Sequence, residues 1–80
     1  MTKDEIKNVI IKQILEIAPD ITADEIAADA NIQRSLEIDS FDFLKILTAL
    51  NEELEVEVPE SDYSEVATLE KMADYFLKRL

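Results

Sequence analysis

The chain has 80 residues, of which 48% are hydrophobic and 34% charged, so we expect one small folded domain over residues 1–80. Nineteen acidic and eight basic residues give a net charge of −11, which repels nucleic acid and anionic lipid and favours basic protein surfaces; the alternative is that this charge only keeps a small protein soluble. The absence of cysteine excludes disulfides and thiolate chemistry, and no apolar run approaches the roughly 18 residues of a membrane span, so we expect a soluble cytoplasmic protein.

The first predicted helix covers roughly residues 3 to 17. Thr2 and Glu5 have the spacing of a capping box, in which each side chain accepts the backbone amide of the other residue. Apolar residues then recur at helical spacing: Ile6, Val9, Ile10, Ile14 and Ile17. Pro19 cannot continue this helix, and residues 19–38 are predicted to form a long connection with one short turn of helix.

A second helix is predicted to begin at Asp39, which is a good N-cap residue. Ser40 and Phe41 then occupy the first turn, and Asp42 adds a carboxylate where the helix dipole is positive. At about 100° per residue, one arc of this helix is apolar and is predicted to face the core. Its residues are Phe43, Ile46, Leu47, Leu50 and Leu54.

A different arc of the same helix, turned by roughly 120° from the core arc, carries further apolar side chains. It contains Phe41, Leu44, Thr48, Glu52 and Glu55, with Lys45 beside it. An apolar patch rimmed by acidic residues next to an exposed serine is typical of a docking face. The alternative is that the apolar residues of this arc pack under the long connection as a satellite of the core.

The C-terminal part is predicted to be an extended connector, a short helical turn and a last helix. Residues 55–59 alternate charge and valine before Pro59, but nothing else in the chain could pair with them as a strand. Thr68 is the expected cap of the last helix, whose apolar residues are Leu69, Met72, Ala73, Phe76 and Leu80. The predicted fold is therefore all-α, a small bundle of three main helices and one or two short ones with a long first loop.

The residues exclude most catalytic roles for Ser40. A nucleophilic serine needs a neighbouring base, and the chain has no histidine, so a serine hydrolase is not expected. The absence of glycine excludes a calcium-binding EF-hand loop, and no metal site is expected. An exposed hydroxyl at a helix N-terminus instead suits the attachment of a phosphate, because free amides and the helix dipole stabilise the anion.

The segment "IDSFDFLKILTALNEELEVEVPE", followed by "VATLEKMADYF", resembles the acyl carrier proteins. The most specific features are the Asp39-Ser40 pair at the helix start, the acidic residues after the core arc, and Thr68 as the last cap. The resemblance implies that a phosphopantetheinyl transferase attaches 4′-phosphopantetheine from coenzyme A to Ser40, with Asp39 as the helix cap. It also implies that the terminal thiol of this arm holds acyl groups as thioesters, so that the chain is a carrier and not an enzyme.

The resemblance further implies how partners and cargo meet the chain. Partner enzymes of fatty-acid, polyketide or related biosynthesis, with basic docking patches, would contact Phe41, Leu44, Lys45, Thr48, Glu52 and Glu55 of a monomeric carrier. The core residues Phe43, Ile46, Leu47 and Leu50 would line an acyl cavity or simply fill it.

Three departures from the usual family pattern favour a specialised stand-alone carrier. Glu37 stands where glycine is usual, Phe41 where leucine or methionine is usual, and Lys45 in a strip that is acidic in carriers of primary fatty-acid synthesis. An aminoacyl, D-alanyl or peptidyl carrier is an alternative, since D-alanyl carriers share the Asp-Ser-Phe sequence. An acidic helical adaptor that is never modified is the alternative from another class, and it would not require the Asp39-Ser40 pair.

Overall fold

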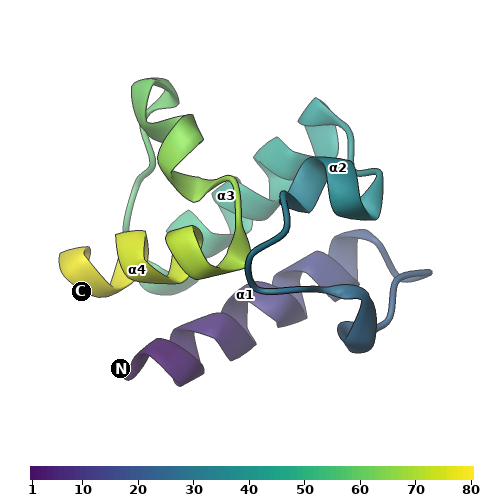
Figure 1. Cartoon of the computed structure of the whole chain (residues 1–80). Coiled ribbons are helices and arrows are strands. Elements are labelled where there is room, and N and C mark those ends of the chain that lie inside the picture. The colour runs from purple at the N-terminus through teal and green to yellow at the C-terminus, as the bar shows by residue number, and fades with distance from the viewer.

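The computed structural model describes residues 1–80 and consists of six helical segments without a strand (Figure 1). In chain order they are α1 (Lys3–Ile17), the 3₁₀ helix η1 (Ala23–Glu25), α2 (Ile32–Leu36), α3 (Ser40–Leu54), the 3₁₀ helix η2 (Glu60–Val66) and α4 (Leu69–Arg79). The predicted all-α class and the three long helices are confirmed. The structure has three short helical segments, where the sequence predicted one or two.

The predicted N-caps of the three long helices are all present. At α1, Thr2 Oγ1 accepts the Glu5 amide at 3.2 Å, and the Glu5 carboxylate accepts the Thr2 amide at 2.8 Å. At α4, Thr68 Oγ1 accepts the Lys71 amide at 3.1 Å. These bonds satisfy amides that have no partner inside the helix, which explains why the sequence located the helix starts well.

The long first connection contains more structure than the sequence predicted. One short turn was expected between residues 19 and 38, but both η1 and α2 lie there. Asn31 caps α2 by accepting the Arg34 amide at 2.9 Å, and the Ile32 amide donates to the Ala67 carbonyl at 2.9 Å. Five residues are too few to show a helical period, and α2 is held by a residue far along the chain, so the pattern alone could not reveal it.

The core lies between α1, α3 and α4, and α1 packs against both other helices. All five residues of the predicted α3 core arc are buried. On α1, Ile6, Ile10 and Ile14 are fully buried, whereas Val9 and Ile17 are half-buried at its edge. Leu80, which the sequence placed on the core arc of the last helix, lies beyond the end of α4 and is exposed.

Polar contacts fix the short helix η2 against α4. The Tyr75 hydroxyl donates to Asp62 Oδ2 at 2.7 Å, and Arg79 Nη2 lies 3.9 Å from the same oxygen. The Arg79 guanidinium also lies 3.5 Å from the centre of the Tyr75 ring, within α4. Burial, together with the hydrogen bond to Asp62, raises the pKa of Tyr75, so the hydroxyl remains a donor over the ordinary pH range. This contact matters for the site because η2 forms one wall beside the start of α3.

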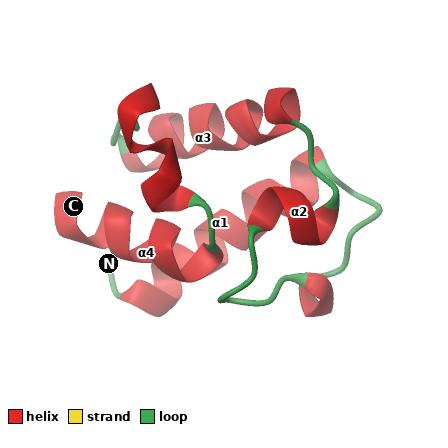
Figure 2. Ribbon diagram, turned by 45° about the horizontal axis from the view of Figure 1, so that its top comes forward, coloured by secondary structure: helices red, strands yellow, loops and turns green.

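The two chain termini lie at one end of the bundle, and α3 begins near the opposite end, beside α2 (Figure 2). The long first connection sweeps around that opposite end before it reaches α2 (Figure 2). None of the helices has the length and apolar character that crossing a membrane would require.

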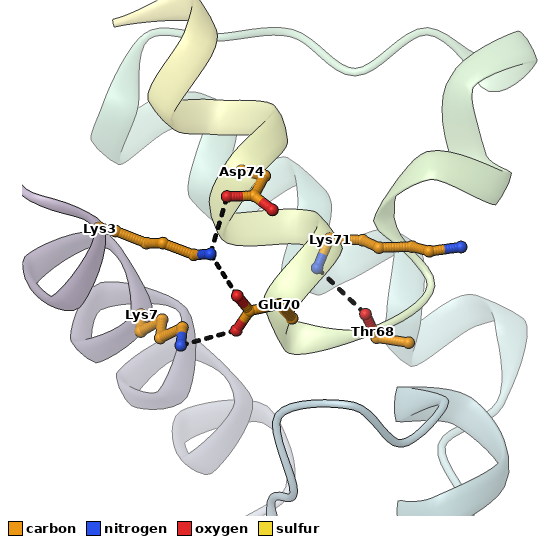
Figure 3. A network of polar contacts seen from close by, with 6 residues as sticks. All are labelled: Lys3, Lys7, Thr68, Glu70, Lys71 and Asp74. Carbon is orange, nitrogen blue, oxygen red and sulfur yellow. Dashed lines mark hydrogen bonds and ion pairs between the residues drawn. The ribbon is translucent and has the colours of Figure 1, made fainter.

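A cluster of ion pairs joins the start of α1 to the start of α4 (Figure 3). Glu70 is hydrogen-bonded to Lys3, and its other carboxylate oxygen lies 2.8 Å from Lys7 Nζ. Lys3 Nζ also lies 2.9 Å from Asp74 Oδ1, so two lysines of α1 hold two carboxylates of α4. The hydrogen bonds from Lys3 and Lys7 lower the pKa of Glu70 to about 2, and the hydrogen bond to Glu70 raises the pKa of Lys3.

We expect the free energy of unfolding to fall at acid pH, because part of the stability comes from this cluster. Since the pKa of Glu70 is lowered in the folded chain, its contribution is complete above the ordinary carboxyl pKa of 4.5 and disappears as the pH falls from there to about 2. Glu70→Gln should therefore lower the urea midpoint at pH 7 modestly, because the cluster is partly exposed, and should lower it little at pH 2. Urea unfolding at both pH values measures this.

Glu16→Gln provides the control for this variant, because Glu16 is exposed on α1 and makes no ion pair. A midpoint shift that is the same at both pH values in Glu70→Gln would contradict an electrostatic contribution. High salt should also shrink the pH 7 difference, since exposed charges are screened.

Candidate functional site

The candidate site is the N-terminal end of α3, where Ser40 is exposed as the first helical residue. Asp39 is the N-cap, as predicted: its Oδ1 accepts the Asp42 amide at 2.8 Å, and its carbonyl accepts the Phe43 amide at 2.9 Å. The amides of Ser40 and Phe41 take part in no hydrogen bond within the chain. The Ser40 hydroxyl therefore lies beside two free N–H donors at the positive end of a helix dipole.

This arrangement favours an anion attached to the hydroxyl rather than activation of the hydroxyl itself. Ser40 Oγ makes no hydrogen bond to any side chain, so no general base is aimed at it. A phosphate ester at this position would face the two free amides and the dipole. No group of three or more histidine, cysteine, aspartate or glutamate side chains is arranged to hold a metal ion.

A groove of about 330 Å³ opens beside Ser40, between α2, α3 and η2. Its lining residues are Gln33, Ser40, Phe43, Leu44, Glu60, Tyr63 and Ala67. The side-chain amide of Gln33 and the hydroxyl of Tyr63 make no hydrogen bond within the chain. No buried side-chain polar atom lacks a partner, so both groups are accessible. The lining of the groove therefore combines apolar side chains with polar groups that are free to hydrogen-bond to a bound group.

A second groove, of about 430 Å³, runs along the outer side of α3, and we call its lining the α3 face. The α3 face consists of Phe41, Leu44, Lys45, Thr48, Ala49 and Glu52. Phe41 is 79% exposed and Leu44 46% exposed, so the alternative that they pack beneath the first connection is wrong. The Thr48 hydroxyl donates to the Leu44 carbonyl at 2.9 Å, which removes one polar group from this surface.

The structure separates some residues that the sequence had grouped. Glu55 does not line the α3 face, because it is the C-cap of α3 and has left-handed backbone angles that end the helix. Of the proposed cavity residues, Phe43 lines the groove beside Ser40 and Leu47 lines a smaller pocket of about 170 Å³ near η2. Ile46 and Leu50 are fully buried in the core and line no pocket.

Sequence reasoning missed the groove residues that lie outside α3. Gln33 belongs to α2, while Glu60 and Tyr63 belong to η2. Both segments are short, so neither has a periodic pattern that shows which side chains face inward. Only the packing of α2 and η2 against the start of α3 places these residues next to Ser40.

The segment that leads into the site contains a residue with unfavourable backbone geometry. Glu37 is the C-cap of α2 with φ 55° and ψ 40°, in the left-handed region that residues other than glycine enter at a cost. The Ile38 amide completes the turn by donating to the Gln33 carbonyl at 3.0 Å. This geometry gives a physical reason why glycine suits the position two residues before Asp39.

Glu37→Gly is expected to stabilise the fold. The left-handed conformation costs a residue with a side chain roughly 1–2 kcal/mol, and glycine avoids this cost. Part of the gain is lost because glycine also has greater freedom in the unfolded chain. We expect a net gain of roughly 0.5–1 kcal/mol in the free energy of unfolding, measured by urea titration. The same substitution at Glu16, inside α1 and exposed, should instead cost about 1 kcal/mol. A loss of stability in both variants would contradict the proposed backbone strain.

Comparisons with known proteins agree with the geometry. Residues 9–76 match the family model described as "Phosphopantetheine attachment site". An acyl carrier protein of Campylobacter jejuni subsp. jejuni serotype O:23/36 (strain 81-176) is 32% identical over 74 residues, covering 92% of this chain and 90% of the relative. An acyl carrier protein of Campylobacter fetus subsp. fetus (strain 82-40) is 32% identical over 72 residues, covering 90% of this chain and 87% of the relative.

The matched region includes α3 with Asp39 and Ser40, the groove beside them, and most of α1 and α4. The family match spans more than half of the chain, and the cofactor of this family is phosphopantetheine. The chain therefore belongs to the acyl carrier protein family, as a carrier of 4′-phosphopantetheine and not as an enzyme.

Proposed function

We propose that Ser40 carries the 4′-phosphopantetheine arm and that the loaded chain delivers acyl groups to partner enzymes. The observation that carries this proposal is the position of Ser40: it is exposed, opens α3, and lies beside two free amides and a groove. The family match includes this residue. The single core, to which every helix except η1 contributes buried residues, supports treating residues 1–80 as one carrier domain.

The residues around Ser40 fit such an arm. In loading, Ser40 Oγ would give up its proton to the transferase and form a bond to the phosphorus that bears pantetheine. The bond from this phosphorus to the bridging oxygen of the diphosphate would break, and adenosine 3′,5′-bisphosphate would leave. The amides of Ser40 and Phe41, which have no partner in the chain, would be available to the phosphodiester, and Asp39 keeps the first turn of α3 formed. When bound, the group supplies a terminal thiol that holds an acyl chain as a thioester. This accounts for an acyl-handling chain without cysteine.

The groove beside Ser40 matches the mixed chemistry of the arm. Phe43, Leu44 and Ala67 present apolar surface, which suits the dimethyl and methylene groups of pantetheine. Gln33 and Tyr63 have free hydrogen-bonding groups, which suit its hydroxyl and two amides. These residues would hold the arm near the carrier between visits to partner enzymes.

We further propose that the α3 face is the docking surface for the phosphopantetheinyl transferase and for acyl-loading, acyl-transfer or condensing enzymes. Phe41 and Leu44 supply exposed apolar area directly beside the attachment point. The strongly acidic balance of the chain favours basic partner surfaces. Tethering the cargo raises its effective concentration at each docked enzyme. The monomeric state, the cytoplasmic location and the biosynthetic pathway expected from the sequence stay predictions.

The test is to incubate the chain with coenzyme A, magnesium and a broad-specificity phosphopantetheinyl transferase and to weigh the intact protein. We expect a gain of one phosphopantetheine mass, located on Ser40 by peptide fragmentation. A folded chain that gains no mass, both here and when isolated from its native cell, would refute the carrier function and favour an unmodified adaptor. If the mass is gained, loading the arm with aminoacyl and fatty-acyl groups in separate reactions would distinguish the classes of cargo.

A further inference from the structure

The α3 face contains a single basic group in a part of the chain that is otherwise acidic. Residues 13–70 hold sixteen acidic residues, and their only basic residues are Arg34 and Lys45. Arg34 lies on α2 and lines neither groove, so Lys45 is the one positive charge among the residues that line the α3 face. A partner that docks on the α3 face therefore meets the positive charge of Lys45 in a part of the chain that is strongly acidic.

The positive charge of Lys45 is available to a partner. Its side chain is 69% exposed, and its nearest carboxylate oxygen, Asp42 Oδ1, lies 3.7 Å away on a residue that does not line the α3 face. A contact of that length between exposed groups one helical turn apart is weak and easily replaced. The ammonium group is therefore neither neutralised by a close partner nor withdrawn from the surface.

Lys45 and Glu52 give the α3 face a fixed charge pattern. They are seven residues apart, so they lie on nearly the same line along the helix and roughly 10 Å apart. Thr48 and Ala49 lie between them and present little polar surface, because the Thr48 hydroxyl bonds back to the helix. Along the helix, the α3 face therefore presents a cation at Lys45, a small apolar stretch and an anion at Glu52. The exposed Phe41 ring lies on the same face.

We propose that Lys45 selects the partners of this carrier: a partner that places a carboxylate opposite Lys45 and a basic group opposite Glu52 docks, and a uniformly basic partner surface is disfavoured. The proposal rests on the carrier function and names the chemistry of its partners. Like charges that face each other across an interface oppose docking, whereas a complementary pattern fixes register and raises the rate of association.

Loading kinetics test the first half of the proposal. The probe is a broad-specificity phosphopantetheinyl transferase with a basic docking surface, and the initial loading rate is measured against carrier concentration. Lys45→Glu should lower KM by about fivefold at low salt without changing kcat, and the gain should vanish near about 1 M salt. Lys12→Glu is the matched control, because Lys12 is exposed on α1, has no ion pair and does not line the α3 face.

Transferase variants test the second half. Single basic residues of its docking surface are replaced by glutamate in turn, and each variant is assayed with the wild-type chain and with Lys45→Glu. The transferase variant whose replaced residue faces Lys45 should load the wild-type chain about fivefold better than the unchanged transferase does, but should load the Lys45→Glu chain no better. The four loading rates form a double-mutant cycle that measures the interaction between Lys45 and that transferase residue.

Two outcomes overturn the inference in different ways. Equal KM values for wild type, Lys45→Glu and Lys12→Glu, with Ser40 fully loaded in all three, would refute the selectivity of Lys45 and leave the carrier function standing. A folded wild-type chain that is never loaded would refute the carrier function and this inference with it.

Discussion

Ser40→Ala is expected to abolish loading completely while leaving the fold intact. Alanine has no oxygen to bond to phosphorus, so the mass gain seen with the wild-type chain should be absent at any transferase concentration. The side chain is exposed and makes no hydrogen bond, so the free energy of unfolding should change by less than about 0.5 kcal/mol. Intact-mass spectrometry and urea unfolding of the same samples measure both quantities.

Ser35→Ala is a suitable control for this variant, because Ser35 is an exposed serine on the neighbouring helix α2. It should load like the wild-type chain. Mass gain in Ser40→Ala would move the attachment point to another hydroxyl, and peptide fragmentation would identify it. A large loss of helicity in Ser40→Ala would contradict the exposed position of the side chain at the start of α3.

Phe76→Ala is expected to have the largest effect on stability. Phe76 is fully buried in the core and lies edge-on to Tyr75, with the ring centres 5.8 Å apart. Removing a buried phenylalanine ring costs about 3–5 kcal/mol, since the lost burial and the remaining cavity add together. A chain of 80 residues has a total stability of only about 4–12 kcal/mol, so this variant should be largely or wholly unfolded in moderate urea.

Phe41→Ala makes the same chemical change at a residue that is 79% exposed. Its unfolding free energy should stay within about 0.5 kcal/mol of the wild-type value, although docking should weaken if Phe41 contacts partners. Urea midpoints of the two variants, followed by circular dichroism, measure the contrast. Similar losses in both variants would mean that the assigned burial of one ring is incorrect.

Several elements were predictable because their signals are local. The three long helices have side-chain caps at Thr2, Asp39 and Thr68, and each is followed by apolar residues at helical spacing. A cap and a period depend on residues within a few positions of each other, so they can be read without knowledge of the fold. The same locality allowed the sequence to place Ser40 at a helix start and Phe41 on an outward arc.

The short helices could not be predicted in the same way, because contacts with residues elsewhere in the chain hold them in place. The helix α2 depends on the bond from the Ile32 amide to the Ala67 carbonyl, and η2 depends on the contact between Asp62 and Tyr75. These partners are far apart in the chain and come together only when the bundle forms. Glu55, predicted to lie on the α3 face, does not line it, because α3 ends at Leu54 and Glu55 has left-handed backbone angles to which a helical period does not apply.

The sequence by itself determined the helical class, the burial arc of α3, the exposed serine behind an aspartate cap and the acidic balance, because each follows from local spacing or from composition. Only the tertiary structure decided that Gln33 and Tyr63 lie beside Ser40, that Lys3 and Lys7 hold Glu70, and that Glu37 has a left-handed backbone. Long-range packing chooses the neighbours of a residue, and no property of the residue's own segment specifies them in advance.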